Sequence, residues 1–387
     1  MATVAIVNAY DDENRGSAAL NLAAVELVRR SDPDAAIGLV TIRDFDASRR
    51  VQGYRHTLAE HPDVQVLPPL VDRRSLVAGS LSAIPAELLA PWTARRGLNE
   101  QTAEFLDSAD LVVSRGGVIY HCRKGRKDLA GLLRRTSALR WAQRRGVPTS
   151  LIGLHVGAVH GAAATRVVRS QFARATVSHP RGALSEARLR SLSPSAHACR
   201  LPDSVFALRP ALDRPAHATT GGRLLLVVSA PLAPYLGQVR SMVDELVAAG
   251  RVGHVAVALQ VTDVDSDRPA VEQLLTSLDR DVELVDEDLS PRQLVDRYAQ
   301  FDLLVSSRLH AAVFGLLAGV PSFPIDVSDD EKAVDVFGEI GLGDFVLTRR
   351  EAPRWAQLVA DRLDDAGTRV VRSVDEAHDR YSRVRVG

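Results

Sequence analysis

Two cationic side chains stand at a predicted junction between a strand and a helix. The apolar run Phe301–Val305 predicts a buried strand, and the helical pattern after it carries Arg308 and His310 in its first turn. This helix ends at Gly319 and Pro321, two residues apart. A helix N-terminus offers unpaired backbone N–H groups and a positive dipole end, to which an arginine and a histidine add further donors. The junction therefore predicts a binding site for a phosphate or a carboxylate, where we expect the chemistry.

A lysine follows the next predicted strand. The segment SFPID, residues 322–326, is followed by acidic residues and then by Lys332, which opens another helical pattern. Because neighbouring parallel strands end at the same edge of a sheet, we expect Lys332 to add a third positive charge near Arg308. The alternative for Arg308 is a structural salt bridge, on the surface or between domains.

Short apolar runs alternate with helical patterns along the chain, which is typical of parallel sheets with crossover helices. The predicted strands are Val4–Asn8, Ala36–Val40, Leu111–Ser114, Ser150–Gly153 and Ala175–Ser178 in the first half, and Leu224–Val228, His254–Leu259, Val282–Val285 and Asp302–Val305 in the second. The predicted helices include Ala18–Arg30 and Asp128–Arg145, and Ser290 with Gln293 forms a capping box. The fold class is therefore α/β, with two Rossmann-like domains that face a central ligand cleft.

The domain boundary is predicted from composition. Residues 209–222 contain prolines and glycines with little apolar content, which indicates a linker. We expect an N-terminal domain over residues 1–208, which holds the acceptor side, and a C-terminal domain over residues 223–387, which holds the donor side. The amphipathic tail, residues 352–384, is expected to form a helix that crosses back over the first domain.

Composition limits the function classes. The chain has 387 residues and a formal net charge of zero, which argues against wholesale binding to nucleic acid or to an anionic membrane. Its two cysteines, Cys122 and Cys199, give neither a disulfide framework nor a metal-ligand pattern. The N-terminus does not resemble a signal peptide and no stretch is long enough to span a membrane, so we expect a cytoplasmic protein. A homo-oligomer is compatible with these features.

Polar residues follow the predicted strands of the first domain. Ser17 is expected to cap the helix after the first strand, and Gly16 would let a ligand approach that N-terminus. After the strand Leu111–Ser114, the pair Gly116–Gly117 would expose backbone N–H groups, and Arg115 is expected to point into the cleft. Each segment has a plainer interpretation as an ordinary polar or glycine turn.

Histidines offer weaker signals. His155 directly follows a predicted strand and is a candidate for the cleft, with a purely structural histidine as the alternative. The spacing between His155 and His160 matches no metal motif, so we expect no metal.

The motif Arg308–Leu309–His310, followed by an apolar helix and Gly319–Val320–Pro321, resembles the hallmark of the polysaccharide pyruvyl transferase family. Further family elements occur in the same order and are similar to Asn14–Arg15–Gly16, Arg115–Gly116–Gly117, Ile152–Gly153, Pro202–Asp203–Ser204–Val205–Phe206, Lys332 and Gly341–Leu342. The resemblance covers most of the chain, although the Arg-Leu-His block is the specific part.

Members of that family resemble GT-B glycosyltransferases in fold and act in polysaccharide biosynthesis. They transfer a pyruvyl group from phosphoenolpyruvate to two sugar hydroxyls, which forms a cyclic pyruvate ketal and releases phosphate. The resemblance implies phosphoenolpyruvate as co-substrate, no cofactor, and a sugar or glycan acceptor that is free or lipid-linked. It also implies that Arg308 grips the anionic groups of the donor, while His310 either binds phosphate or protonates the methylene carbon.

The resemblance and the positions after the predicted strands together give two groups of expected binding residues. The donor-binding residues would be Ser307, Arg308, Leu309, His310, Lys332, Arg115, Gly116 and Gly117. The acceptor-binding residues would be Asp12, Asn14, Gly16, Ser17 and His155.

The chain departs from the family pattern at two places. Ser17 stands where the family commonly has an aspartate, and His179–Pro180–Arg181 stands where it has an Arg-Asp pair. Asp11, Asp12 or Glu13 would have to substitute for the first acid. Two other functions therefore stay open. One is a GT-B glycosyltransferase that uses a nucleotide sugar and holds its ribose with Asp326 or Glu287, and the other is a non-catalytic binding subunit.

Overall fold

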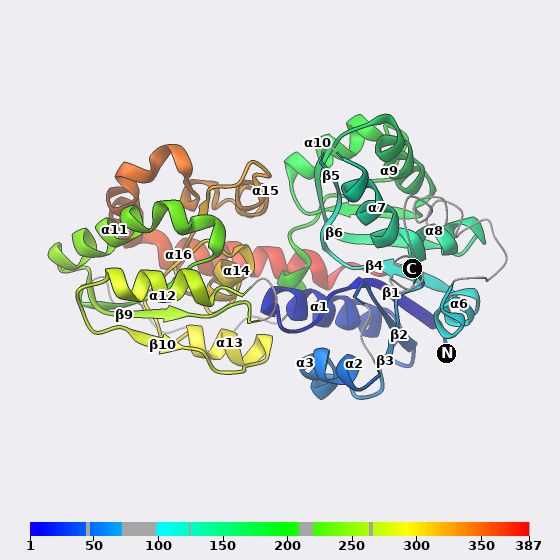
Figure 1. Ribbon diagram of the computed structural model, residues 1–387, viewed down its shortest axis with the longest axis horizontal. Helices are drawn as coiled ribbons and strands as arrows, with labels where there is room; N and C mark the ends of the chain where they lie inside the picture. The colour runs from blue at the N-terminus through cyan, green and yellow to red at the C-terminus, as the bar shows by residue number, and fades with distance from the viewer. Residues whose placement is uncertain (44–46, 72–97, 124, 209–219, 263–265, 387) are drawn as a thin grey trace. The chain divides into compact units, whose positions relative to one another are not determined.

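The chain divides into two compact units. The computed structural model describes residues 1–43, 47–71, 98–123, 125–208, 220–262 and 266–386 (Figure 1). The first unit comprises Met1–Asp12, Ser17–Ala207 and Arg383–Gly387, and the second comprises Glu13–Gly16 and Leu208–Ser382. Most of the expected linker, residues 209–219, lies outside the described residues, and Gly222 already begins a strand.

The first unit is built on a parallel sheet. Its strands in the described residues are β1 (Thr3–Ala9), β2 (Ala36–Thr41), β3 (Gln65–Leu67), β4 (Leu111–Ser114), β5 (Gly117–Cys122), β6 (Thr149–Val159) and β7 (Val177–Pro180). They are ordered β3-β2-β1-β4-β6-β5, with β7 also paired to β6. The chain runs outward from β1 to β3 and then returns to β4, so the strand order reverses between β1 and β4. The five predicted strands are confirmed, with β6 longer than predicted and β7 starting two residues later.

A break separates β4 from β5. Both strands pair with successive parts of β6, because Val113 lies opposite Ser150 and Gly117 lies opposite Leu154. Arg115 and Gly116 form the break, and a Cβ on Gly116 would lie 2.9 Å from the carbonyl oxygen of Gly153. The glycine is therefore needed for close packing of backbone, and Gly117 begins a strand where the sequence suggested a turn.

Helices connect the strands of the first unit. Those in the described residues are α1 (Arg15–Ser31, whose first two residues belong to the second unit), α2 (Ala47–Gly53), α3 (Arg55–Glu60), α6 (Glu100–Asp107), α7 (Arg126–Arg135), α8 (Ser137–Arg144), α9 (Ala162–Arg174) and α10 (Ala183–Leu192), with a 3-10 turn at Ser204–Ala207. The single helix predicted over Asp128–Arg145 is wrong, since α7 ends before the buried Thr136. The Thr136 hydroxyl donates to the carbonyl oxygen of Leu132 at 2.8 Å, a local bond that competes with regular helix geometry.

The second unit is also built on a parallel sheet. Its described strands are β8 (Gly222–Val227), β9 (Val252–Ala258), β10 (Glu283–Val285), β11 (Leu303–Ser306), β12 (Ser322–Asp326) and β13 (Leu347–Thr348), in the order β10-β9-β8-β11-β12-β13. The order reverses between β8 and β11. The predicted strands are confirmed to within two residues at each end, and so is the α/β class with two parallel-sheet domains.

The helices of the second unit complete its core. Within the part of the chain that the structure describes, they are α11 (Leu236–Ala248), α12 (Arg268–Ser277), α13 (Pro291–Tyr298), α14 (Leu309–Leu317), α15 (Lys332–Glu339) and α16 (Trp355–Ser382), with 3-10 turns at Ala230–Tyr235, Gly343–Phe345 and Arg349–Arg354. The predicted capping box is confirmed, because Ser290 and Gln293 make both of its hydrogen bonds. The central helix α14 is buried from Ala311 to Leu317 and packs on β11, β12, α13 and α16.

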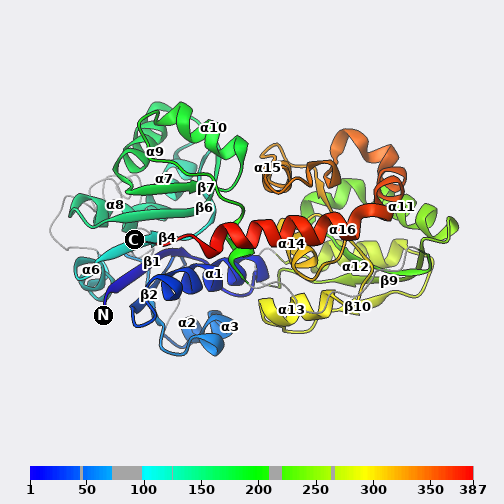
Figure 2. The same cartoon turned by 180° about the vertical axis from the view of Figure 1, so that it is seen from behind.

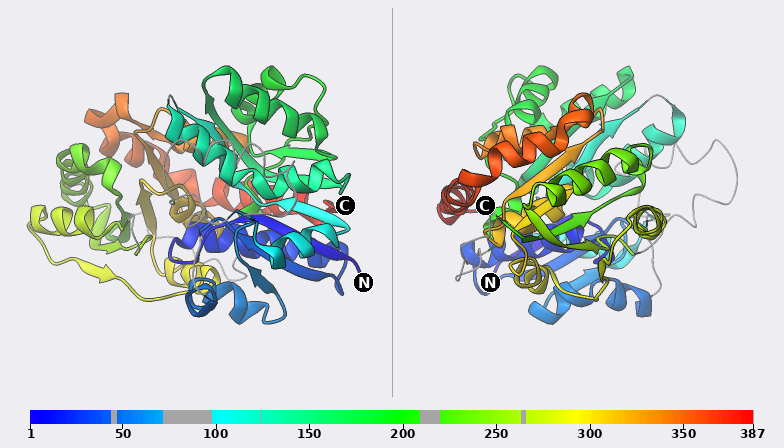
Figure 3. Two further views of the ribbon diagram at one scale, coloured as in Figure 1. Left: turned by 45° about the vertical axis from the view of Figure 1, so that its right-hand side comes forward. Right: turned by 90° about the vertical axis from the view of Figure 1, so that its left-hand side faces the viewer.

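The long helix α16, red in Figure 2, belongs to the second unit. Residues after its end belong to the first unit, where the Val386 amide donates to Ser31 Oγ at 2.9 Å. Figure 3 gives two further views of the strands and helices. Within the described residues, every helix is too short or too polar to cross a membrane.

The close packing of α14 gives a stability prediction. A Cβ on Gly315 would meet Ser322 Oγ and lie 3.0 Å from Leu304 Cδ1. Ser322 is fully buried and its hydroxyl donates to the Val320 carbonyl, so it has no room to move. We expect Gly315→Ala to lower the free energy of unfolding by roughly 1–3 kcal/mol, measured by denaturant titration.

Gly338→Ala is the matched control. This glycine lies in α15, and no atom lies within 4 Å of the place that an added methyl would take, so alanine should raise stability by roughly 0.4–1 kcal/mol. Equal effects of the two substitutions would contradict the packing described for α14.

Candidate active site

Arg308 lies at the point where the second sheet reverses its strand order. It directly follows β11 and Ser307, and it is the N-cap residue of α14. Its backbone is fixed by Ser306, whose Oγ accepts from the Arg308 amide at 2.9 Å and donates to the Arg308 carbonyl at 2.8 Å. Ser307 Oγ lies 2.8 Å from Ser229 Oγ, which follows the neighbouring strand β8. The predicted strand-to-helix junction is confirmed.

A buried carboxylate holds the Arg308 side chain. Arg308 Nε donates to both oxygens of Asp267 at 3.1 and 3.2 Å, and Nη2 donates to Oδ1 at 2.5 Å. Asp267 is fully buried, whereas 26% of the Arg308 side chain is exposed. Burial raises the pKa of Asp267, and the hydrogen bonds and charge of Arg308 oppose that rise. Arg308 therefore forms a structural salt bridge, but with a buried acid of its own unit and not on the surface or between domains, and part of the arginine is still open to solvent.

Asp267 stands at the N-cap of α12 without capping it. Aspartate at this position normally accepts from the first turn of its own helix, which contributes about 1 kcal/mol. Asp267 makes no such bond, and its side chain turns to Arg308 instead. The carboxylate therefore binds Arg308 and leaves the first turn of α12 without a hydrogen bond from the Asp267 side chain.

His310 packs against the N-terminal segment of the chain. A Cβ on Gly16 would lie 2.7 Å from both Cβ and Cγ of His310 and would also collide with Nδ1. Any side chain at position 16 would therefore displace the imidazole. The structure thus brings Gly16, predicted on the acceptor side, next to the catalytic candidate His310.

The segment Glu13–Gly16 is attached to the second unit by several contacts. Asn14 forms an antiparallel bridge with Val261, and Thr262 Oγ1 donates to Glu13 Oε2 at 2.7 Å. The buried Arg15 pairs with Asp288 at 2.7 Å. These contacts fix the start of α1 beside His310.

Two helix N-termini therefore meet at His310. Helix α14 begins at Leu309, and helix α1 begins at Arg15. Asn14 Oδ1 accepts from the Gly16 amide at 3.1 Å, so Asn14 performs the capping role predicted for Ser17. The prediction for Ser17 is wrong because the helix begins two residues before it. Two positive helix ends and a cationic side chain favour a ligand with more than one anionic group.

Asp326 is the last residue of the adjacent strand β12, and Lys332 follows that strand. Lys332 opens α15 as predicted, and its Nζ lies 3.6 Å from Asp330 Oδ2. Asp326 Oδ1 accepts from the amide and hydroxyl of Ser328, and Oδ2 accepts from the Ala333 amide. The Asp326 carboxylate therefore stabilises its own turn and the start of α15.

Asp12, Ser17 and His155, three of the predicted acceptor-binding residues, belong to the first unit. The fully buried Asp12 carboxylate accepts from the amides of His56 and Thr57 at 3.0 and 2.9 Å, and burial raises its pKa. His155 is fully buried in β6, with Nδ1 3.3 Å from Ser185 Oγ. These contacts anchor α3 to the loop after β1 and α10 to β6.

The first unit also holds Arg115 and the ion pair between Arg181 and Asp203. Arg115 is 2% exposed, and its Nε donates to the Asn8 carbonyl at 2.8 Å. Arg181, which follows β7, pairs with Asp203 at 2.7 Å, and both side chains are buried. In the segment His179–Pro180–Arg181, which differs from the Arg-Asp pair of the family, the arginine therefore pairs with an aspartate that lies 22 residues later in the sequence.

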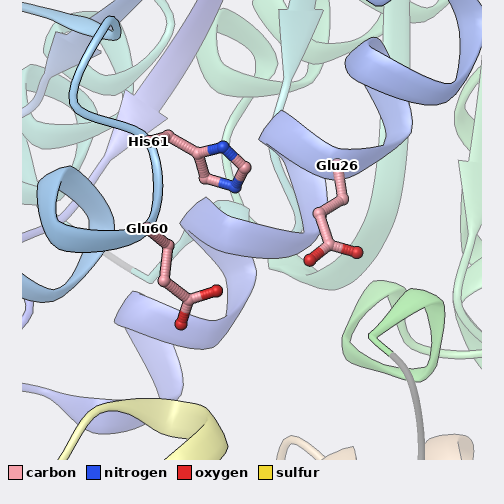
Figure 4. Close-up of side chains that lie close together, drawn as sticks. All are labelled: Glu26, Glu60 and His61. Carbon is pink, nitrogen blue, oxygen red and sulfur yellow. The ribbon is translucent and has the colours of Figure 1, made fainter.

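Among the described residues, one cluster consists of side chains of the types that bind metal ions. The ligand atoms of Glu26, Glu60 and His61 lie within 4.8 Å of one another (Figure 4). Glu26 is also within 3.6 Å of Arg30, which offsets part of the negative charge. The cluster therefore does not require a cation, and no role follows from it.

The family is decided by comparison with known proteins. The model of the family described as polysaccharide pyruvyl transferase matches residues 14–329. The chain belongs to the polysaccharide pyruvyl transferase family. This confirms the resemblance carried by the Arg-Leu-His motif, and the matched range includes both Gly16 and His310. A comparison with curated proteins finds no match.

Solved structures confirm the GT-B fold of this family member. It is similar to HepE from Anabaena in complex with UDP and glucose, with a TM-score of 0.57, 14% identity, and coverage of 98% of this chain and 95% of that one. It is also similar to UDP-GlcNAc 2-epimerase from Methanocaldococcus jannaschii, with a TM-score of 0.56, 9% identity, and coverage of 97% and 100%. At these identities the likeness concerns the fold alone.

The contact between Gly16 and His310 gives a prediction. Gly16→Ala should displace the imidazole and lower the melting temperature, because the added methyl would lie within 2.7 Å of two ring-proximal carbons. Histidine NMR spectra should show a changed His310 resonance. Gly237→Ala, a helical glycine of the same unit with nothing within 4 Å, should change neither quantity in this way. An unchanged His310 resonance in Gly16→Ala would contradict the described contact.

Proposed function

We propose that this protein transfers a pyruvyl group from phosphoenolpyruvate to a sugar or glycan diol, with formation of a pyruvate ketal and release of phosphate. The observation that carries the proposal is the cationic junction at the start of α14, where Asp267 holds Arg308 and Gly16 packs against His310. Phosphoenolpyruvate carries a phosphate and a carboxylate on one small frame. Membership of the pyruvyl transferase family supports the same reaction.

The proposed chemistry assigns a role to each group. Arg308 would bind an anionic group of the donor through the part of its side chain that remains exposed. His310 would protonate the C3 methylene, which becomes a methyl group and leaves C2 electrophilic. The two sugar hydroxyls form two C–O bonds at C2, and the C2–O bond to phosphate breaks. One hydroxyl proton restores the proton that His310 gave to C3, and the other leaves with phosphate. The helix N-termini would stabilise the departing phosphate.

A nucleotide-sugar donor has weaker support in the residues. The carboxylate proposed for the ribose, Asp326, is used within its own turn. Glu287 lies 3.6 Å from Arg297, and half of its side chain is exposed. Nucleotide sugars therefore serve best as control ligands.

Calorimetric titration with phosphoenolpyruvate tests the proposal. Wild-type protein should bind the donor, and Arg308→Ala should weaken binding by about tenfold to a hundredfold, since a hydrogen bond to a charged group contributes roughly 1.5–3 kcal/mol. A UDP-sugar should bind more weakly than phosphoenolpyruvate. Tight binding of the UDP-sugar together with no binding of phosphoenolpyruvate would refute the proposed donor.

The role of Asp267 can be tested by chemical rescue. Guanidinium ion at millimolar concentration should restore part of the phosphoenolpyruvate affinity of Arg308→Ala, because the buried Asp267 carboxylate remains to hold it. The double variant Arg308→Ala/Asp267→Asn should show no rescue. Asp244, which pairs with Arg280 at 2.7 Å and is 45% exposed, provides the matched control for removal of an acid. Equal rescue with and without Asp267 would show that the carboxylate does not position the cation.

A further inference from the structure

Arg115 occupies the same topological position in the first unit as Arg308 does in the second. Strand order reverses between β1 and β4 in one sheet and between β8 and β11 in the other. Arg115 directly follows β4, as Ser307 and Arg308 follow β11. In open parallel sheets, ligands bind beyond the carboxyl ends of the strands at such a reversal. Each sheet therefore has an arginine where a ligand is expected.

The two arginines differ in their partners. Arg308 is held by a buried carboxylate, whereas Arg115 is held by a carbonyl: its Nε donates to Asn8 O at 2.8 Å. The Arg115 guanidinium lies 5.2 Å from the centre of the Tyr10 ring. Its Nη1 is buried and has no hydrogen-bond partner among the described residues. Arg115 thus has one donor group that the described protein leaves unused.

The charge of Arg115 also has no direct counter-ion in the described part of the chain. Burial lowers its pKa to about 10, so the side chain is still a cation at neutral pH. The nearest acids are engaged elsewhere, since Asp11 pairs with Arg43 at 3.1 Å and Asp12 accepts from the amides of His56 and Thr57. A buried cation without an ion pair is costly, and a bound anion would remove that cost.

The backbone around Arg115 is specialised. Asn8, whose carbonyl receives the guanidinium, has a φ of 70° although it is not a glycine. Its side chain donates to Ser114 Oγ at 2.8 Å, which ties the end of β1 to the end of β4. Strained residues of this kind persist where the surrounding structure holds them, and they are frequent at ligand sites. Here the strain presents the carbonyl that orients Arg115.

We propose that Arg115, which was expected among the donor-binding residues, instead forms an anion subsite for the acceptor in the first unit, and that the acceptor is a sugar carrying a carboxylate or a phosphate. This inference rests on the proposed pyruvyl transfer, since it names the class of acceptor. The unused Nη1 would donate to the anionic group, while the Nε bond to Asn8 keeps the guanidinium in place. A carboxylate would come from a uronic acid and a phosphate from a glycosyl phosphate.

Matched ligands on one sugar frame test the subsite by calorimetry. Methyl glucoside is the neutral probe, methyl glucuronide carries the carboxylate, and glucose 1-phosphate carries the phosphate. We expect the wild type to bind one of the anionic sugars at least tenfold tighter than methyl glucoside. The preferred anion then distinguishes a uronic acid from a glycosyl phosphate.

Variants assign the preference to Arg115. Arg308→Ala should keep the preference for the anionic sugar, whereas Arg115→Gln should abolish it. Arg135→Gln is the matched control, because Arg135 lies in the same unit and its Nε and Nη2 donate to the carbonyls of Ile119 and His121. Thermal unfolding checks that each variant folds. If Arg115→Gln does not fold, Arg115→Lys replaces it and should reduce the preference while keeping the charge.

Several results would overturn the proposal. They are equal binding of neutral and anionic sugars by the wild type, a preference lost in Arg308→Ala, and a preference kept in the Arg115 variant. Weaker phosphoenolpyruvate binding by Arg115→Gln, without loss of the sugar preference, would place the residue on the donor side instead. The proposed function fails separately if wild-type protein does not bind phosphoenolpyruvate.

Discussion

The contact between Asp267 and Arg308 is the interaction on which the candidate site depends. A fully buried carboxylate is costly unless a cation meets it, and Arg308 meets it through three hydrogen bonds. Because two Arg308 nitrogens are bound at once, the plane of the guanidinium is fixed. Helix α14, buried over most of its length, holds the arginine at its N-terminus. Position, orientation and charge at this junction therefore follow from one ion pair inside one unit.

The N-terminal segment Glu13–Gly16 is far in sequence from the rest of the second unit, and it supplies the residue that packs against His310. Glu13, Asn14 and Arg15 are each attached to that unit, and their contacts place Gly16 against His310. The start of α1 therefore meets the start of α14, and a small dianion suits a place where two helix ends converge. This arrangement explains physically why a glycine is needed at position 16.

Much of the fold could be predicted from the sequence, because apolar runs, caps and turn residues are local signals. The strands around Arg308 and the capping box at Ser290 are examples. The partners of the site residues were not predictable in this way. Asp267 lies 41 residues before Arg308 and has the sequence position of an ordinary N-cap, so its turn away from its own helix gives no local signal. The contact of Gly16 with His310 likewise depends on tertiary packing.

The same limit applies in the first unit. The Gly116–Gly117 pair indicated a turn, but it marks a break between two strands that pair with one edge of β6. Asp12 is an acid in a polar loop by sequence, and the fold buries it beneath the start of α3. In both cases the local sequence correctly predicted a polar or glycine-rich segment. Long-range packing, however, determined which contacts these residues make.

The most direct test of the central claim is a crystal structure of the protein with phosphoenolpyruvate. We expect an anionic group of the donor to contact the exposed part of Arg308, with C3 within reach of His310. Donor bound with Arg308 released from Asp267 would contradict the positioning role of the ion pair. Donor bound without contact to either Arg308 or His310 would contradict the site itself.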